Sequence, residues 1–96
     1  MAVSPQTTAK LQATTVLQSV LHRGDRTLSC DVIARGRRSY DVCVVPHWDV
    51  SSSVIETFSA GTKAVRRHAE LSWLFRQAGW ERLSSWDFGR ETQAVA

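Results

Sequence analysis

The sequence predicts an α+β domain, in which a four-stranded antiparallel meander is followed by one long C-terminal helix packed on one face of the sheet. Three observations predict this fold. Apolar and polar residues alternate through much of residues 14–58, glycine turns separate the alternating runs, and residues 60–78 repeat apolar side chains at helical spacing. A chain of 96 residues, 43% of them hydrophobic, forms one globular domain. We assign residues 14–88 to this domain and expect flexible segments at 1–13 and 89–96.

The first hairpin is expected to turn at Gly24-Asp25, because two-residue turns of this composition join antiparallel strands. Such a turn places Leu21 directly opposite Leu28. The two strands then share one apolar face, which contains Leu17, Leu21, Leu28, Cys30 and Val32.

The same region also contains residues that are typical of the two ends of a helix, so residues 5–22 could form either a helix or a strand. Ser4 is a suitable N-cap for a helix, Pro5 suits its first turn and Gly24 suits its end. Against the helix stand four threonines and Val16, whose branched side chains weaken helices. Together with the match across the turn, these residues favour the strand.

The second hairpin turns around Gly36 and ends at Pro46, and its register decides what the two cysteines do. A two-residue turn would place Cys30 opposite Cys43, close enough for a disulfide or a shared metal. A three-residue loop instead sorts the apolar residues onto one face and turns Cys43 to the other. Hydrophobic sorting favours the second register, so we expect both cysteines to be reduced structural thiols.

The run VIETF, residues 54–58, alternates as a fourth strand, and the helix follows it. We expect Ser59 to cap this helix and Gly79 to end it in a left-handed conformation. Trp80 then folds back on Phe75. At about 100° per residue, the following side chains face the sheet: Ala64, His68, Leu71, Phe75 and Ala78.

His68 lies on the core-facing side, so we expect a neutral imidazole that is hydrogen-bonded to a strand or loop group. No HxxxH, HExxH or GxSxG pattern accompanies it, and the isolated glycines form no phosphate-binding loop. The two cysteines match no zinc-site spacing. We therefore expect that the protein is not an enzyme and that it holds no metal or cofactor.

Trp73 lies nearly opposite the core-facing side, among charged residues. Because interfaces are enriched in Trp and Arg, this side of the helix is a candidate partner interface. Either the following segment covers Trp73 with Trp86 or Phe88, or a second molecule does. The candidate interface consists of Trp73, Arg66, Arg76 and Gln77.

These features predict a small soluble, non-enzymatic interaction module. Its small core favours self-association, as a homodimer or with another protein partner, through a sheet edge or the Trp73 side of the helix. No stretch approaches the roughly 20 apolar residues of a membrane span, and the first residues do not resemble a secretory signal. The expected location is the cytoplasm.

The alternative function is low-specificity binding of single-stranded or structured nucleic acid. The net charge is +3, from 12 basic and 9 acidic residues, and an aromatic side chain among arginines can stack on a base. In the order of elements alone, a four-stranded meander followed by a helix resembles the Pur-type and Whirly-type nucleic-acid binders, and no residue is carried over from them. The candidate contacts are Arg35, Arg37, Arg38, Trp48, Lys63, Arg66 and Arg67.

Overall fold

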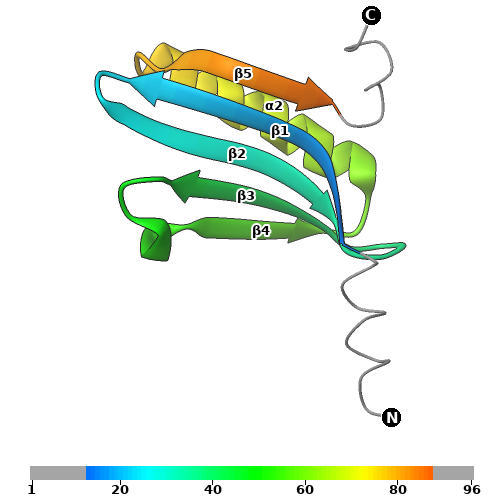
Figure 1. Ribbon diagram of the computed structural model, residues 1–96. Helices are drawn as coiled ribbons and strands as arrows, with labels where there is room; N and C mark the ends of the chain where they lie inside the picture. The colour runs from blue at the N-terminus through cyan, green and yellow to red at the C-terminus, as the bar shows by residue number, and fades with distance from the viewer. Residues whose placement is uncertain (1–12, 88–96) are drawn as a thin grey trace, which may run out of the picture.

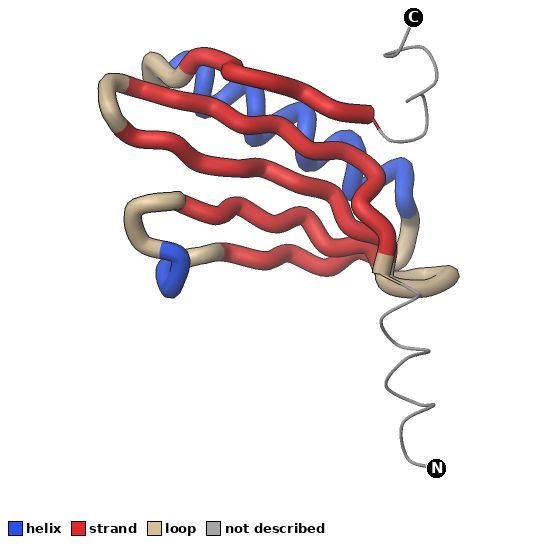
Figure 2. The backbone as a smooth tube through the Cα atoms, in the orientation of Figure 1, coloured by secondary structure: helices blue, strands red, loops and turns tan. Residues whose placement is uncertain are grey.

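Five antiparallel strands in the order β4-β3-β2-β1-β5 form one sheet, and helix α2 lies across one of its faces (Figures 1 and 2). The computed structural model describes residues 13–87, with side chains through residue 83; the segments 1–12 and 88–96 lie outside the described residues. The predicted fold class, an antiparallel meander with one helix packed on it, is confirmed. The elements are β1 (Thr14–Arg23), β2 (Arg26–Ala34), β3 (Tyr40–Pro46), the 3-10 helix η1 (Val50–Ser52), β4 (Val54–Phe58), α2 (Gly61–Gln77) and β5 (Glu81–Asp87).

The first hairpin has the predicted register. Leu21 pairs with Leu28 and Leu17 pairs with Val32, so the strand prediction is confirmed for the described part of residues 5–22. Gly24 has a φ of 62°, which fits the first central position of a type II′ turn, where glycine is favoured.

The second hairpin has the register that separates the cysteines. Arg35 N–H donates to the Ser39 carbonyl at 2.7 Å, and this bond closes a loop of three residues. Cys30 then pairs with Val44, while Cys43 pairs with Asp31 on the other face. Hydrophobic sorting therefore predicted this register correctly.

Helix α2 begins one residue later than the predicted cap requires. The N-cap is Ala60, without a side-chain hydrogen bond, so the prediction of Ser59 is wrong. The Ala60 carbonyl accepts the first helical bonds, from the N–H groups of Lys63 and Ala64. Gly61 then packs against the ring of Tyr40, where an added Cβ would lie 3.2 Å from a ring carbon.

The end of α2 is as predicted at Gly79 and Trp80. Gly79 has a φ of 98°, and the Trp80 N–H donates to the Phe75 carbonyl at 3.0 Å. The Trp80 ring meets the Phe75 ring edge-on at 6.2 Å. Ala78 does not face the sheet as predicted: it is the exposed C-cap, and its carbonyl accepts a 2.9 Å bond from Arg23 Nη1.

The core lies between α2 and the sheet face that it covers. Its buried members include Ala64 from the helix and the predicted Leu21, Leu28, Cys30 and Val32 from β1 and β2. Leu71 and Phe75 pack against this cluster while remaining partly exposed. The helix orientation inferred from spacing is therefore confirmed.

The sheet has a fifth strand that the sequence did not predict. β5 returns along β1 and pairs with it from Leu17 to His22. The pairing shifts between Val20 and Leu21, where Leu83 is the extra residue of a β-bulge. This bulge breaks the alternation of residues 81–87, which explains why these residues lacked the period of a strand.

Candidate functional site

His68 is a buried residue whose Nε2 forms hydrogen bonds within the fold. Its Nε2 lies 3.1 Å from the Cys30 carbonyl, which can only accept, so Nε2 carries the proton and donates it. The Ser19 hydroxyl oxygen lies 3.3 Å from the same nitrogen and shares that proton. Burial lowers the pKa of His68, which favours the neutral form. The predicted hydrogen bond to a strand is confirmed.

The two thiols are free and buried on opposite faces of the sheet. Burial raises the pKa of Cys30 to about 12 and also raises the pKa of Cys43. A nucleophilic cysteine needs a thiolate at neutral pH, so both environments oppose that role.

The face of the sheet away from α2 carries a polar cluster on β2 and at the residue that follows β3. His47 Nε2 lies 2.6 Å from the Ser29 hydroxyl oxygen. Nearby, Asp31 has a buried carboxylate oxygen without a hydrogen-bond partner in the described chain, and burial raises its pKa. Within the described residues, no group of three or more His, Cys, Asp or Glu side chains is placed to hold a metal ion.

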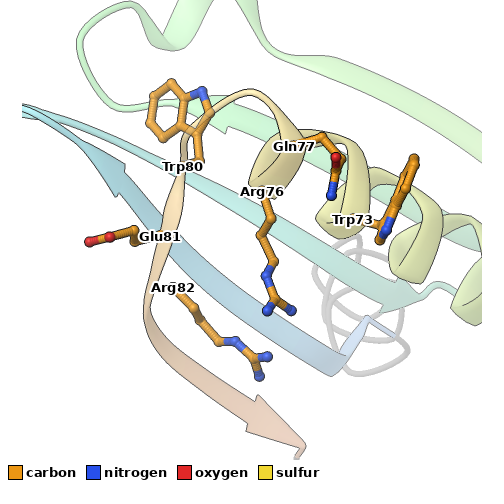
Figure 3. A pocket seen from close by; sticks show the side chains of 6 residues that line it. All are labelled: Trp73, Arg76, Gln77, Trp80, Glu81 and Arg82. Carbon is orange, nitrogen blue, oxygen red and sulfur yellow. The ribbon is translucent and has the colours of Figure 1, made fainter.

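The predicted partner interface lies beside a groove between α2 and β5, which we call the Trp73 groove (Figure 3). It consists of two adjoining hollows, of about 570 and 360 Å³, that share Trp73, Arg76 and Arg82. Gln77 lines the larger hollow, so three of the four predicted interface residues meet here. Arg66 lies on the other side of Trp73, in a shallow hollow on the outer surface of α2.

Trp73 is 60% exposed, as expected for a residue opposite the core-facing side. The side chain of Trp86 and the whole of Phe88, which were predicted to cover it, lie outside the described side chains.

Trp48, predicted to contact nucleic acid, lies at the end of the sheet where β1 turns into β2. Its ring stacks on Trp80 with centroids 6.0 Å apart, and the Arg26 guanidinium lies 4.7 Å from its centroid. Arg23 lies over Trp80 at 5.2 Å. These contacts join the sheet to the end of α2.

Four of the predicted nucleic-acid contacts belong to two segments at the opposite end of the sheet. The β2–β3 loop and the start of α2 lie together there (Figure 1), joined by the packing of Tyr40 on Gly61. We call this surface the basic end, and it is formed by Arg37, Arg38, Lys63 and Arg66. None of these four side chains forms an ion pair within residues 13–83.

The other two predicted cations are held by acidic partners. Arg35 Nε donates to Asp41 at 2.7 Å, and the Thr57 hydroxyl donates to the same carboxylate, also at 2.7 Å. Both hydrogen bonds lower the pKa of Asp41, and the bond from Thr57 lowers it more than the bond from Arg35. Arg67 donates to Glu56 at 2.8 Å and to Glu70 at 3.2 Å.

Strand β4 forms the outer edge of the sheet and presents apolar side chains to solvent. It is terminal in the strand order and pairs only with β3 in the described chain. Val54 and Ile55 are more than half exposed, although they point to opposite faces. The sequence predicted an interface at a sheet edge without saying which one, because the order of strands was not known.

Sequence reasoning missed the polar residues that β1 and β5 bring to the Trp73 groove, Ser19, Glu81 and Arg82, and it also missed Ser72. Ser72 had the features of an ordinary polar helix residue, and Arg82 belongs to the strand that was not predicted. The described chain contains no helix with the length and apolar character needed to cross a membrane. Comparison with protein-family models, curated proteins and solved structures returns no match to this chain.

Proposed function

We propose that this chain is a non-enzymatic interaction module that self-associates, and that two copies pair along the outer edge of β4. The observation that carries this proposal is the exposed edge itself. A terminal strand presents unpaired N–H and C=O groups that can bind a strand of another chain, and proteins usually protect such edges with lysine, proline or a bulge. Residues 54–58 contain no lysine or proline, and the pairing of β4 with β3 shows no register shift.

Apolar side chains are concentrated beside this edge. Of the eight large hydrophobic side chains that are exposed in the described chain, three lie within residues 50–55: Val50, Val54 and Ile55. Covering them would remove apolar surface from water, and the burial of such surface is the main favourable term in association.

Charge does not oppose the pairing. The one charged residue of β4 is Glu56, and its carboxylate is held by Arg67. A two-fold symmetric pair would place the same strand on both sides of the interface and extend each sheet into one continuous sheet. The other sheet edge, β5, contains the bulge at Leu83, a device that disfavours pairing with a further strand.

Sedimentation velocity over a range of concentrations tests this proposal. We expect the wild type to form dimers and Ile55→Lys to remain monomeric, because a lysine at this position disfavours edge pairing. Val65→Lys is the matched control, since it makes the same kind of change on the exposed surface of α2. Trp73→Glu tests the helix surface directly, and we expect it to dimerise like the wild type.

Two results would contradict the proposal. A wild type that stays monomeric at high concentration rules out self-association. A dimer that persists in Ile55→Lys and is lost in Trp73→Glu shows that the interface lies on α2 instead of β4.

A second candidate function, nucleic-acid binding, rests on the basic end. Two neighbouring segments supply four cations that have no acidic partner among the described side chains, and phosphate contacts of such cations are sequence-independent. Trp48 lies at the other end of the sheet, so this candidate function rests on the four cations alone. If a single strand binds there, replacing Arg37 and Arg38 together with Ala should flatten the salt dependence by about two units. No binding at low salt would exclude it.

The cytoplasmic location belongs to the same proposal. Cys30 and Cys43 are buried and placed apart, so they form no disulfide framework, and proteins of reducing compartments usually lack one.

A further inference from the structure

The Trp73 groove contains two arginines that have no acidic partner among the described side chains. Arg76 comes from the last turns of α2 and Arg82 from the start of β5, and both extend into the space between these elements (Figure 3). Glu81 also lines the larger hollow, but its side chain points away from both arginines and its carboxylate lies 3.5 Å from His22 Nε2. Neither arginine forms an ion pair within residues 13–83.

Two like charges that line the same hollows repel each other, and an anion between them would remove that repulsion. The positive field of Arg82 also reaches the floor of the groove, where it disfavours protonation of His68. An anionic ligand is therefore the chemistry that this surface favours.

Hydroxyl groups complete the donor set on the floor of the smaller hollow. The Ser72 hydroxyl oxygen is buried and has no hydrogen-bond partner in the described chain. Since His68 donates through Nε2, the Ser19 oxygen accepts from it and keeps its own hydrogen for another acceptor. Both serines line the same hollow as the two arginines.

We propose that the Trp73 groove binds a phosphomonoester, with its phosphoryl group between Arg76 and Arg82 and its organic group against Trp73. Guanidinium groups bind phosphate oxygens through paired N–H donors, and a dianion balances two of them. A single carboxylate would balance only one. The hollows, of about 570 and 360 Å³, have the size of small-molecule sites, and the exposed Trp73 ring supplies a wall on which a flat group can stack.

This binding site is independent of self-association through β4, because β4 and β5 are opposite edges of the sheet. A dimer that pairs along β4 leaves the Trp73 groove open.

Isothermal titration calorimetry at low ionic strength tests the site with three probes: inorganic phosphate, phenyl phosphate and phenol. We expect phenyl phosphate to bind roughly tenfold more tightly than inorganic phosphate, since ring stacking on Trp73 adds to the phosphate contacts. Phenol should show no binding at the same concentrations, because it lacks the charge.

Variants locate the binding. Arg76→Gln and Arg82→Gln should each weaken phenyl phosphate binding by about tenfold or more, as expected for loss of a charge-assisted contact. Trp73→Leu should lower the affinity for phenyl phosphate to that for inorganic phosphate. Arg26→Gln is the matched control, because it removes the same charge from an exposed arginine that lines neither hollow, and it should leave the affinity unchanged. The arginines exchanged are exposed, so we expect these variants to fold like the wild type.

Three outcomes would overturn the proposal. The first is that neither phosphate probe binds. The second is that Arg26→Gln weakens binding as much as Arg76→Gln, which would show general attraction to a basic protein. The third is that phenol binds as tightly as phenyl phosphate, which would show an apolar site.

Discussion

Substitution of Leu21 by Ala should destabilise the protein by about 3 kcal/mol. Leu21 is 1% exposed and belongs to the core between β1 and α2. The change removes three buried carbon atoms, each worth about 0.8 kcal/mol of transfer free energy. The cavity left behind adds to that loss and brings the total to about 3 kcal/mol, within the range found for buried leucines.

The matched control is Leu83→Ala, which makes the same chemical change at the bulge of β5. Leu83 is 60% exposed, so less than half of its surface is covered. The transfer cost is then about 1 kcal/mol at most, and no cavity forms.

Urea denaturation, monitored by tryptophan fluorescence, measures the loss in the free energy of unfolding for both variants. It should be carried out at one low protein concentration, because self-association adds to apparent stability. Equal losses for Leu21→Ala and Leu83→Ala, or a loss below about 1 kcal/mol for Leu21→Ala, would refute the assignment of the core.

Three further predictions concern pH, redox state and the end of the helix. Burial lowers the folded-state pKa of His68 below its ordinary 6.5. As the pH falls through 6.5, His68 therefore takes up a proton in the unfolded state before it does so in the folded state. Wild type should then lose stability relative to His68→Gln by up to about 1.4 kcal/mol per pH unit, and parallel pH profiles in urea denaturation would contradict this. Quantitative thiol labelling of unfolded protein, with exchange blocked, should find Cys30 and Cys43 both free, whereas a disulfide between them would contradict the observed register. Gly79→Ala should cost about 1 to 2 kcal/mol in thermal or urea unfolding, because a φ of 98° strains an L-residue; an unchanged midpoint would show that the helix end adapts.

The registers of the first two hairpins could be predicted because local and long-range signals agree there. The turn at Gly24 and the apolar alternation on both sides of it allow one pairing, and a slip by one residue would move the apolar side chains to the wrong face. The same sorting separated Cys30 from Cys43.

The prediction failed where the structure departs from local periodicity. The bulge at Leu83 hides the strand character of residues 81–87. The cap of α2 was misplaced because the helix starts where the chain packs closely on Tyr40, a contact made across the fold. Neither feature has a signal in neighbouring residues alone.

In the candidate sites too, features set by local spacing could be predicted and features set by contacts across the fold could not. The exposure of Trp73 followed from helical spacing, which is a local property. The convergence of Arg76 with Arg82 depends on the return of β5 along β1, so no spacing within one element could reveal it. Likewise, the exposed edge at β4 follows from the order of strands in the sheet.

Hydrogen–deuterium exchange at low and high protein concentration tests the central claim, self-association along β4, most directly. If two copies pair edge to edge, backbone amides of residues 54–58 that face solvent in one copy gain hydrogen bonds in the pair. Their exchange should slow as concentration rises, while exchange in β5 stays the same. Suppose that sedimentation shows dimers at the higher concentration. Identical exchange in residues 54–58 at both concentrations would then contradict pairing along β4.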